Sequence, residues 1–502
     1  MQRQGQNSYK KYAKKQEEKE MRSEERYPGY WEDVRLTGIV PSPRQIAHQK
    51  MEYFGFIHFT VNTFTGKEWG SGEESPSLFH PEKLDAGQWA ETAAKGGMTG
   101  LILTCKHHDG FCLWPSAYTE HSVKNSPYKE GKGDIVKELS QACREQGLQF
   151  GVYLSPWDRN HPAYGTGKPY DDYYVNQLTE LLTNYGEIFT VWLDGACGEG
   201  QNGKKQVYDW ERYYEVVRRL QPGANIFGCG PDVRWCGNEA GDTRPSEWSV
   251  VAAGLADAEK VAADSQQEDN EQFREKKISS TAQNLGGRDV LKEEKKLIWY
   301  PAEVDVSIRP GWFYHEEEND RVRSFENLKE IYLKSVGGNC TLLLNIPPDK
   351  EGLIREEDRK SVFLLGDFIR ESFRVNLAEK AEMTVLPSAD CEGKDGRVLL
   401  EPGDSTWFRN PDGQRELQIT FRWEEECRLT YLVVQEAIAF SQRVEQFEVC
   451  ILEEDGSWKP NASGTTIGYK RIVKLGGMRT KGIRFTVTDA RVAPVLAFIG
   501  VF

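Results

Sequence analysis

An aspartate follows a short apolar run near the middle of the chain. Residues 188–193 (IFTVWL) combine β-branched and aromatic side chains between Gly186 and Gly195, a pattern typical of a strand buried on both faces. Asp194 comes directly after this run. Parallel barrels carry their catalytic side chains at the carboxyl ends of strands, so this position suits a nucleophile or an acid–base group. The same aspartate could instead cap a helix or open a turn.

Histidines, acids and aromatic residues also follow other apolar runs. The candidates at or just beyond predicted strand ends are His58, Glu68, Trp69, His107, His108, Tyr153, Trp157, Trp235 and Glu239. A lone histidine at a strand end is more often structural than functional. Several hydrogen-bonding types at the same predicted face are harder to explain in that way. We therefore expect these side chains to converge on one site.

Two kinds of chemistry could use these residues. Metal-assisted hydrolysis would take His58, His107, His108 and an acid as ligands, but adjacent histidines in an extended segment point to opposite sides. Acid–base cleavage of a glycoside needs two carboxyl groups instead. Asp194 suits the nucleophile of that reaction. Glu239 suits the acid because the apolar Trp235 beside it would raise its pKa, although a solvated loop acid is the simpler interpretation of Glu239.

Strand and helix signals alternate along most of the chain before residue 378. The predicted strands are 53–59, 101–104, 150–154, 188–194, 226–229, 303–308 and 341–346. The predicted helices are 85–95, 134–146, 171–184, 210–220 and 355–370. Such alternation favours an α/β fold with a parallel, (β/α)8-like TIM-type barrel. A barrel of this kind would bring the candidate residues to one mouth.

Short alternating runs replace this pattern after about residue 378. They are separated by Gly, Asp, Asn and Pro, and they predict a C-terminal antiparallel β-sandwich. We therefore predict a charged, flexible lead-in at 1–26, a catalytic barrel at 27–377 and a β-sandwich domain at 378–502. The polar segment 253–297 is predicted to be an insertion or a long loop with helical pieces.

Composition and charge limit the binding partners and the cell compartment that we expect for the protein. The net charge is −14 and no basic stripe is interleaved with aromatic residues, so we expect no nucleic acid partner. Ten cysteines are scattered without a CxxC motif, which fits reduced thiols. No signal peptide is visible and no apolar run is long enough to span a membrane, so we expect a cytoplasmic protein without membrane contact. The oligomeric state stays open.

Six segments carry a resemblance to a known family. They are IHFTVNTFTGKEWG (57–70), LTCKHHDGFCLWPS (103–116), GVYLSPWDRN (151–160), VWLDG (191–195), RWCGNEAG (234–241) and WYPAEVDVSIRPGWFYH (299–315). Together they resemble glycoside hydrolase family 29, the retaining α-L-fucosidases. The HF–N–F–T–G–EWG spacing and the GNE motif are most similar to the branch that cleaves α-1,3 and α-1,4 fucosyl linkages.

The resemblance implies a role for each matching residue. Asp194 matches the nucleophile and Glu239 the general acid/base. The residues that match the binding site for the fucose hydroxyls and ring are His58, Glu68, Trp69, His107, His108 and Tyr153. Trp235 is also expected to bind the substrate. Trp312 is expected to line the pocket around the sugar's methyl group. No cofactor and no metal are expected.

These expectations describe an exo-acting enzyme that releases α-1,3/1,4-linked L-fucose from branched, Lewis-type glycans by double displacement. One alternative is a broad-specificity fucosidase that also accepts aryl fucosides and α-1,2 linkages. Another is a non-catalytic, lectin-like protein that binds fucose. The presence of both Asp194 and Glu239 argues against the lectin, because binding alone does not need a nucleophile.

Overall fold

A computed structural model gives the fold of residues 27, 29–264, 283–387, 396–403 and 406–502. Contacts divide the chain into two compact units. One consists of Pro41–Asn284 and Trp299–Val375 and contains a parallel barrel. The other contains Leu285–Ile298, Asn376–Phe502 and the chain up to Val40. The lead-in predicted at 1–26 lies outside the described residues.

The barrel is an eight-stranded sheet with the strand order β5-β4-β3-β2-β1-β10-β9-β6. Its strands are β1 (Tyr53–Ile57), β2 (Gly100–Lys106), β3 (Gln149–Leu154), β4 (Thr190–Leu193), β5 (Asn225–Gly228), β6 (Arg234–Trp235), β9 (Ala302–Ser307) and β10 (Cys340–Asn345). Every neighbouring pair in this order is parallel. A parallel bridge between Phe227 and Val233 brings the two ends of the sheet together. The predicted α/β barrel is therefore confirmed.

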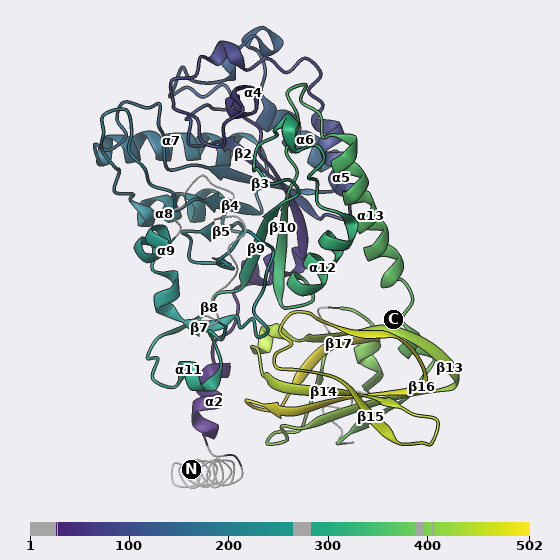
Figure 1. The fold of residues 1–502 in the computed structure, drawn as a ribbon. Coiled ribbons are helices and arrows are strands. Elements are labelled where there is room, and N and C mark those ends of the chain that lie inside the picture. The colour runs from purple at the N-terminus through teal and green to yellow at the C-terminus, as the bar shows by residue number, and fades with distance from the viewer. Residues whose placement is uncertain (1–26, 28, 265–282, 388–395, 404–405) are drawn as a thin grey trace, which may run out of the picture. The chain divides into compact units, whose positions relative to one another are not determined.

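Helices follow most of the strands and surround them (Figure 1). They are α3 (Pro43–Met51), α4 (Val61–Thr65), α5 (Ala86–Lys95), α6 (Ile135–Glu145), α7 (Lys168–Asn184), α8 (Trp210–Leu220), α9 (Ala258–Asp264), α12 (Phe325–Ser335) and α13 (Glu356–Ser372). Helix α6 shows why they form. Asp134 accepts a hydrogen bond from the Lys137 amide at its start, the apolar stripe from Ile135 to Cys143 is buried, and Gly147 follows its end with a φ of 71°.

The sequence prediction was wrong about one strand of the barrel. Seven strands were predicted, and the segment around Trp235 was assigned to a loop. The structure places Arg234 and Trp235 in β6, which pairs with β9. This short strand completes the sheet, and it holds Trp235 beside the residues of β9.

The second unit contains an antiparallel sheet of seven strands, as predicted for the C-terminal part. These are β11 (Glu382–Leu386), β12 (Phe408–Arg409), β13 (Leu417–Glu436), β14 (Val444–Leu452), β15 (Trp458–Gly464), β16 (Arg471–Ala490) and β17 (Val495–Val501). The long strands β13 and β16 pair over most of their length with register shifts. Such shifts bend a sheet, and this sheet folds over a core that includes Phe421, Phe447 and Phe485.

Two segments predicted as part of the barrel domain group instead with this second unit. They include α2 (Tyr30–Thr37) and α11 (Arg288–Leu291). Asp33 of α2 is buried, and its carboxylate accepts hydrogen bonds from Arg288 at 2.7 Å and from Arg415 at 2.8 Å. A buried carboxylate needs such partners, so Asp33 links α2 to α11 and to the segment that contains Arg415.

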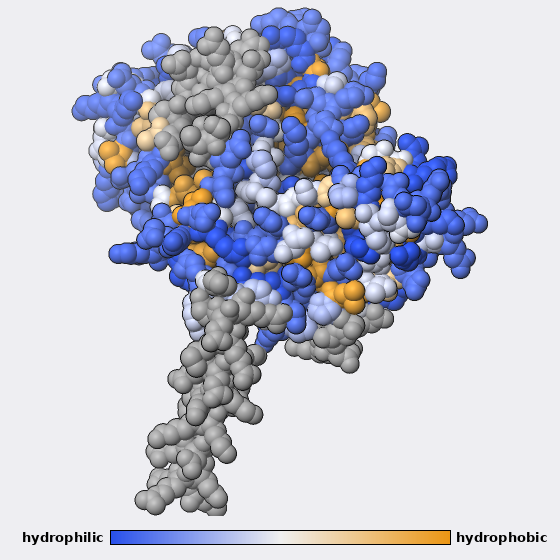
Figure 2. All heavy atoms as spheres, turned by 60° about the horizontal axis from the view of Figure 1, so that its bottom comes forward, coloured by the Kyte–Doolittle hydropathy of each residue, from blue (hydrophilic) through white to orange (hydrophobic). Residues whose placement is uncertain are grey.

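The face shown in Figure 2 is covered mostly by hydrophilic residues, with hydrophobic residues in small groups. Small apolar groups of this kind are normal on a protein surface. None of the helices in the described part of the chain combines the length and the apolar character that crossing a lipid bilayer requires.

Candidate active site

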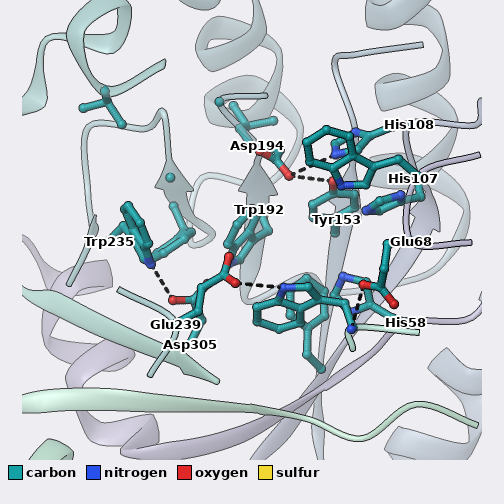
Figure 3. Close-up of a pocket in the computed structure, with 18 residues that line it drawn as sticks. His58, Glu68, His107, His108, Tyr153, Trp192, Asp194, Trp235, Glu239 and Asp305 are labelled. Carbon is teal, nitrogen blue, oxygen red and sulfur yellow. Dashed lines mark hydrogen bonds and ion pairs between the residues drawn. The ribbon is translucent and has the colours of Figure 1, made fainter. Parts of the chain in front are cut away.

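A cavity in the barrel unit gathers all ten residues that were predicted to have a catalytic or substrate-binding role (Figure 3). Its lining includes Phe56, His58, Glu68, Trp69, His107, His108, Tyr153, Trp192, Asp194, Phe227, Trp235, Glu239, Val261, Asp305 and Trp312. Most of these side chains stand in or just after a barrel strand. The barrel topology therefore brings together residues that are more than 250 positions apart in the chain.

Asp194 is held by one hydrogen bond on each carboxylate oxygen. It follows β4 directly, and 21% of its side chain is exposed. The Tyr153 hydroxyl at the end of β3 donates to Oδ2 at 2.8 Å, and the Ala196 amide donates to Oδ1 at 2.8 Å. Burial and the Asp194 charge raise the pKa of Tyr153 well above its ordinary value, so the phenol stays a donor. The carboxylate is thus oriented and accessible from the cavity.

The segment with His107 and His108 is anchored by a buried lysine. Lys106 at the end of β2 is fully buried, and its ammonium donates to Asp158 at 3.0 Å and to Gln177 at 2.9 Å. It also lies 5.1 Å from the centre of the Tyr173 ring. A buried ammonium needs such partners, so these contacts fix the end of the strand from which both histidines project.

His58 and His108 present the same kind of nitrogen to the cavity. The Asn345 amide group donates to Ser307 and to the Trp312 carbonyl, so its oxygen accepts from Nδ1 of His58 at 2.8 Å. The Ser155 hydroxyl donates to the Trp157 carbonyl and accepts from Nδ1 of His108 at 2.7 Å. In the neutral tautomer that these partners select, Nε2 of each ring is an acceptor.

All three histidines of the cavity are neutral at pH 7. Burial lowers the pKa of His58 and of His108 to about 4, and it lowers the pKa of His107 well below its ordinary value. Nε2 of His108 lies 3.8 Å from Oδ2 of Asp194. Neutral imidazoles bind hydroxyl groups without adding charge, so they suit an uncharged polyol rather than an anion.

Glu68 contacts the loop that carries Trp312. Its carboxylate accepts from the backbone amides of Trp312 at 2.8 Å and Phe313 at 3.1 Å, and from Nε2 of His315 at 2.7 Å. The hydrogen bond to Glu68 raises the pKa of His315, which favours an ion pair. Gly311 permits this approach, since a Cβ atom there would lie 2.6 Å from a Glu68 oxygen. Glu68 therefore fixes one wall of the cavity.

Glu239 enters the cavity from a different side than Asp194 (Figure 3). It is buried, with 5% exposed, and Nε1 of Trp312 donates to its Oε2 at 3.2 Å. Beside it, Nε1 of Trp235 donates to Asp305 at 2.6 Å. Two carboxyl groups near indole rings thus form the wall of the cavity opposite Asp194.

Aromatic rings form the remaining surface of the cavity. The Trp192 ring stacks on Phe227 with 4.7 Å between ring centres and lies 5.6 Å from Phe56. Trp69 packs edge-on against His108 and against Trp157. Aromatic faces suit the C–H side of a sugar ring and a methyl substituent.

Several residues of the site were not among the predicted candidates. Trp192 and Asp305 lie within strands rather than at their ends, and Ser155 and Asn345 act through the histidines that they orient. The signal for Asp305 was an acid that alternates with Val304 and Val306 in a predicted strand. Trp157 was a predicted candidate, but it packs against Trp69 and is not part of the cavity lining.

The arrangement suits the cleavage of a glycoside by two carboxyl groups. Asp194 is an oriented carboxylate, and Glu239 faces it across the cavity from a buried position. Neutral histidines and aromatic faces between them match the hydroxyls and the apolar side of one pyranose ring. Among the residues that the structure describes, no group of three or more histidine, cysteine or carboxylate side chains is placed to hold a metal ion.

Comparisons with known proteins agree with this chemistry. Residues 9–372 match the family model described as Alpha-L-fucosidase. A curated relative, Alpha-L-fucosidase 1 of Arabidopsis thaliana, is 38% identical over 472 residues, which cover 92% of this chain and 87% of that protein.

Solved structures with the same fold are also similar in sequence. A glycoside hydrolase family 29 fucosidase of Ruminococcus gnavus, solved in complex with fucose, has a TM-score of 0.80 and 31% identity over 92% of this chain and 95% of its own. A glycoside hydrolase 29 family member from an unknown rumen bacterium has a TM-score of 0.75 and 38% identity, covering 92% of this chain and 77% of that one.

Proposed function

We infer the reaction from one premise: the chain belongs to the α-L-fucosidase family of glycoside hydrolases, family 29, and is an α-L-fucosidase. We propose that it works by double displacement with retention at C1. Asp194 attacks C1 while Glu239 protonates the departing oxygen, and Glu239 then takes a proton from the water that releases fucose. The observation that carries this proposal is the entry of two carboxyl groups from different sides into one cavity.

The cavity supports an exo mode of action. Its lining comes from seven of the eight barrel strands or the segments just after them, which favours a closed pocket for one terminal sugar rather than an open groove. Nε2 acceptors on His58 and His108 would bind fucose hydroxyls, and the rings of Trp192, Phe227 and Trp312 offer apolar surface for the methyl group.

We further propose selectivity for α-1,3 and α-1,4 linkages in branched, Lewis-type glycans. The support is the sequence of segments 57–70 and 237–239, which resemble the selective branch of the family. Release of fucose from a Lewis-type trisaccharide, an α-1,2-fucosylated disaccharide and an aryl fucoside, measured side by side, tests this proposal. We expect hydrolysis of the trisaccharide to exceed that of the other two by about 100-fold or more, which lies within the range over which enzyme sites discriminate between related substrates.

The other outcomes of this comparison are equally informative. Comparable rates on all three substrates would replace the selective enzyme by a broad-specificity fucosidase. Binding of fucose without release from any of the three would indicate the lectin-like alternative and contradict the proposed reaction.

Tyr153 gives a test of the nucleophile's surroundings. Tyr153→Phe removes the hydrogen bond to Oδ2 of Asp194 and leaves the ring packed against Trp192. A hydrogen bond to a charged group contributes about 1.5–3 kcal/mol, so we expect kcat to fall by about 10- to 100-fold. Hydrolysis of an aryl fucoside measures this effect, and circular dichroism checks the fold. An unchanged kcat would show that the bond does not orient Asp194.

A further inference from the structure

Asp305 is a buried carboxyl group that the proposed mechanism does not use. It lies inside β9 with 3% of its surface exposed, and it lines the same cavity as Glu239. The two side chains lie next to each other in Figure 3. Each accepts a hydrogen bond from an indole: Trp235 donates to Asp305 at 2.6 Å, and Trp312 donates to Glu239 at 3.2 Å. Two carboxyl groups therefore share one wall of the pocket.

A third acid lies on the same face of β9. Glu303 is two positions before Asp305, so both side chains point to the same side of the strand. Glu303 is 1% exposed, and one of its oxygens lies 3.1 Å from Nε2 of His48, on α3. His48 therefore contacts Glu303 and not Asp305, whose neighbouring acid in the cavity is Glu239.

The strands on either side of β9 provide no charge that faces Asp305. On β10, the neighbours in register are Thr341 beside Glu303 and Leu343 beside Asp305. On β6, Arg234 is the charged residue, and its guanidinium donates to Glu247 at 2.6 Å and to the Trp248 carbonyl at 3.1 Å. The charges that act on Asp305 thus come from two other acids.

Burial and the neighbouring charges of Glu239 and Glu303 raise the pKa of Asp305 well above its ordinary value. Two carboxyl groups that interact in a site of low dielectric lose their protons in two separated steps. Between those two steps the pair carries a single proton.

We propose that Asp305 is a positioning residue for Glu239 and that the two carboxyl groups share one proton at neutral pH. This inference rests on the proposed role of Glu239 as the acid/base. The shared proton passes to the glycosidic oxygen while the bond from C1 to that oxygen breaks and Asp194 bonds to C1. The pair then carries two negative charges.

The second step restores the starting state. Water attacks C1, the bond from C1 to Asp194 breaks, and the proton of that water returns to the pair. Repulsion between the two charges of the intermediate makes Glu239 a stronger base at the step that needs one. Asp305 therefore serves both halves of the cycle through Glu239.

The test is Asp305→Asn, followed by the pH dependence of kcat/KM on a fucosylated oligosaccharide. The asparagine oxygen can still accept from Trp235, but the side chain cannot ionise. Glu239 then loses its proton at lower pH, because no like charge remains beside it. We expect the alkaline limb of the profile to move down by about one pH unit or more, while the acidic limb stays in place. An aryl fucoside whose leaving group needs no proton should show a smaller displacement.

Two further variants separate this role from a structural one. Trp235→Phe removes the indole donor and keeps both carboxyl groups, so its alkaline limb should stay or move to higher pH. Glu303→Gln removes the more distant acid and should move the limb down, by less than Asp305→Asn does. If Asp305→Asn does not fold, as judged by circular dichroism, the direction of the Glu303→Gln shift decides.

An alkaline limb that stays in place in Asp305→Asn would overturn the shared proton. So would equal losses at every pH in Asp305→Asn and Trp235→Phe, because that pattern indicates packing alone. Failure of the wild-type protein to release fucose, or Glu239→Ala with unchanged kcat on the oligosaccharide, would contradict the proposed function itself.

Discussion

Asp194→Ala or Asp194→Gly is expected to lower kcat for fucoside hydrolysis by about 10,000-fold or more while the fold stays intact. The variant has no group that can bond to C1, and it lacks the anion that stabilises the oxocarbenium-like transition state. The fold should tolerate the change because the side chain lies at the cavity surface, where its hydrogen-bond partners are Tyr153 and Ala196. Turnover of an aryl fucoside and a thermal unfolding curve measure the two parts of this expectation.

Asp172→Ala is a matched control for the loss of one aspartate. Asp172 lies in α7, and its carboxylate is partly exposed and pairs with Lys168 and Arg212. This variant should keep wild-type rates. Azide offers a second check, since it can attack C1 from the face that Asp194 leaves open and should give the fucosyl azide with inverted configuration. Near wild-type rates in Asp194→Ala would show that another group is the nucleophile.

Glu239→Ala is expected to have the second large effect, and its size should depend on the leaving group. On a natural glycan, whose departing oxygen needs a proton, kcat/KM should fall by about 1,000-fold or more. On an aryl fucoside with a good leaving group the loss should be much smaller in the first step. Azide should then rescue the second step by attacking the fucosyl–enzyme, and the product should have retained configuration.

Glu211→Ala provides the control for this substitution. Glu211 is an exposed residue in the first turn of α8, away from the cavity lining. Kinetics on both substrate types should match the wild type. Equal damage to both substrates in Glu239→Ala, without rescue by azide, would mean that Glu239 does not transfer the proton.

The barrel could be predicted because its strands are apolar runs bounded by glycine or polar residues. The bounds of β2 and β4 lie within two residues of the predicted bounds. β6 could not be predicted in this way, since a two-residue strand has no periodicity. Helix α3 was also missed, although Ser42 and Gln45 form a capping box that the sequence displays.

The division of the chain was harder to predict than its elements. Asp33 and Arg415 are 382 positions apart in the chain and form an ion pair, and no local sequence pattern predicts a pairing of that kind. The ordered chain was predicted to begin at residue 27, directly before the barrel, so α2 was assigned to the barrel domain. Its grouping with the second unit depends on buried ion pairs that only tertiary structure reveals.

The candidate site could be predicted where its functional side chains lie at the ends of strands. His107, His108 and Asp194 follow apolar strands, and the parallel topology then brings them together. Asp305 was missed because a residue inside a strand is normally assigned to packing. Ser155 and Asn345 were missed because they orient histidines across the fold, a relation that sequence spacing does not contain.

The most direct test of the central claim is to identify the residue that bonds to the sugar. A 2-deoxy-2-fluorofucosyl fluoride should form the covalent intermediate and release it slowly, because the fluorine at C2 destabilises both transition states and the good leaving group at C1 offsets this in the first step alone. Peptide mass spectrometry of the trapped protein should show one added fluorofucosyl group on the peptide that contains Asp194. A group attached to a different carboxylate, or turnover without any adduct and with inversion at C1, would contradict the account.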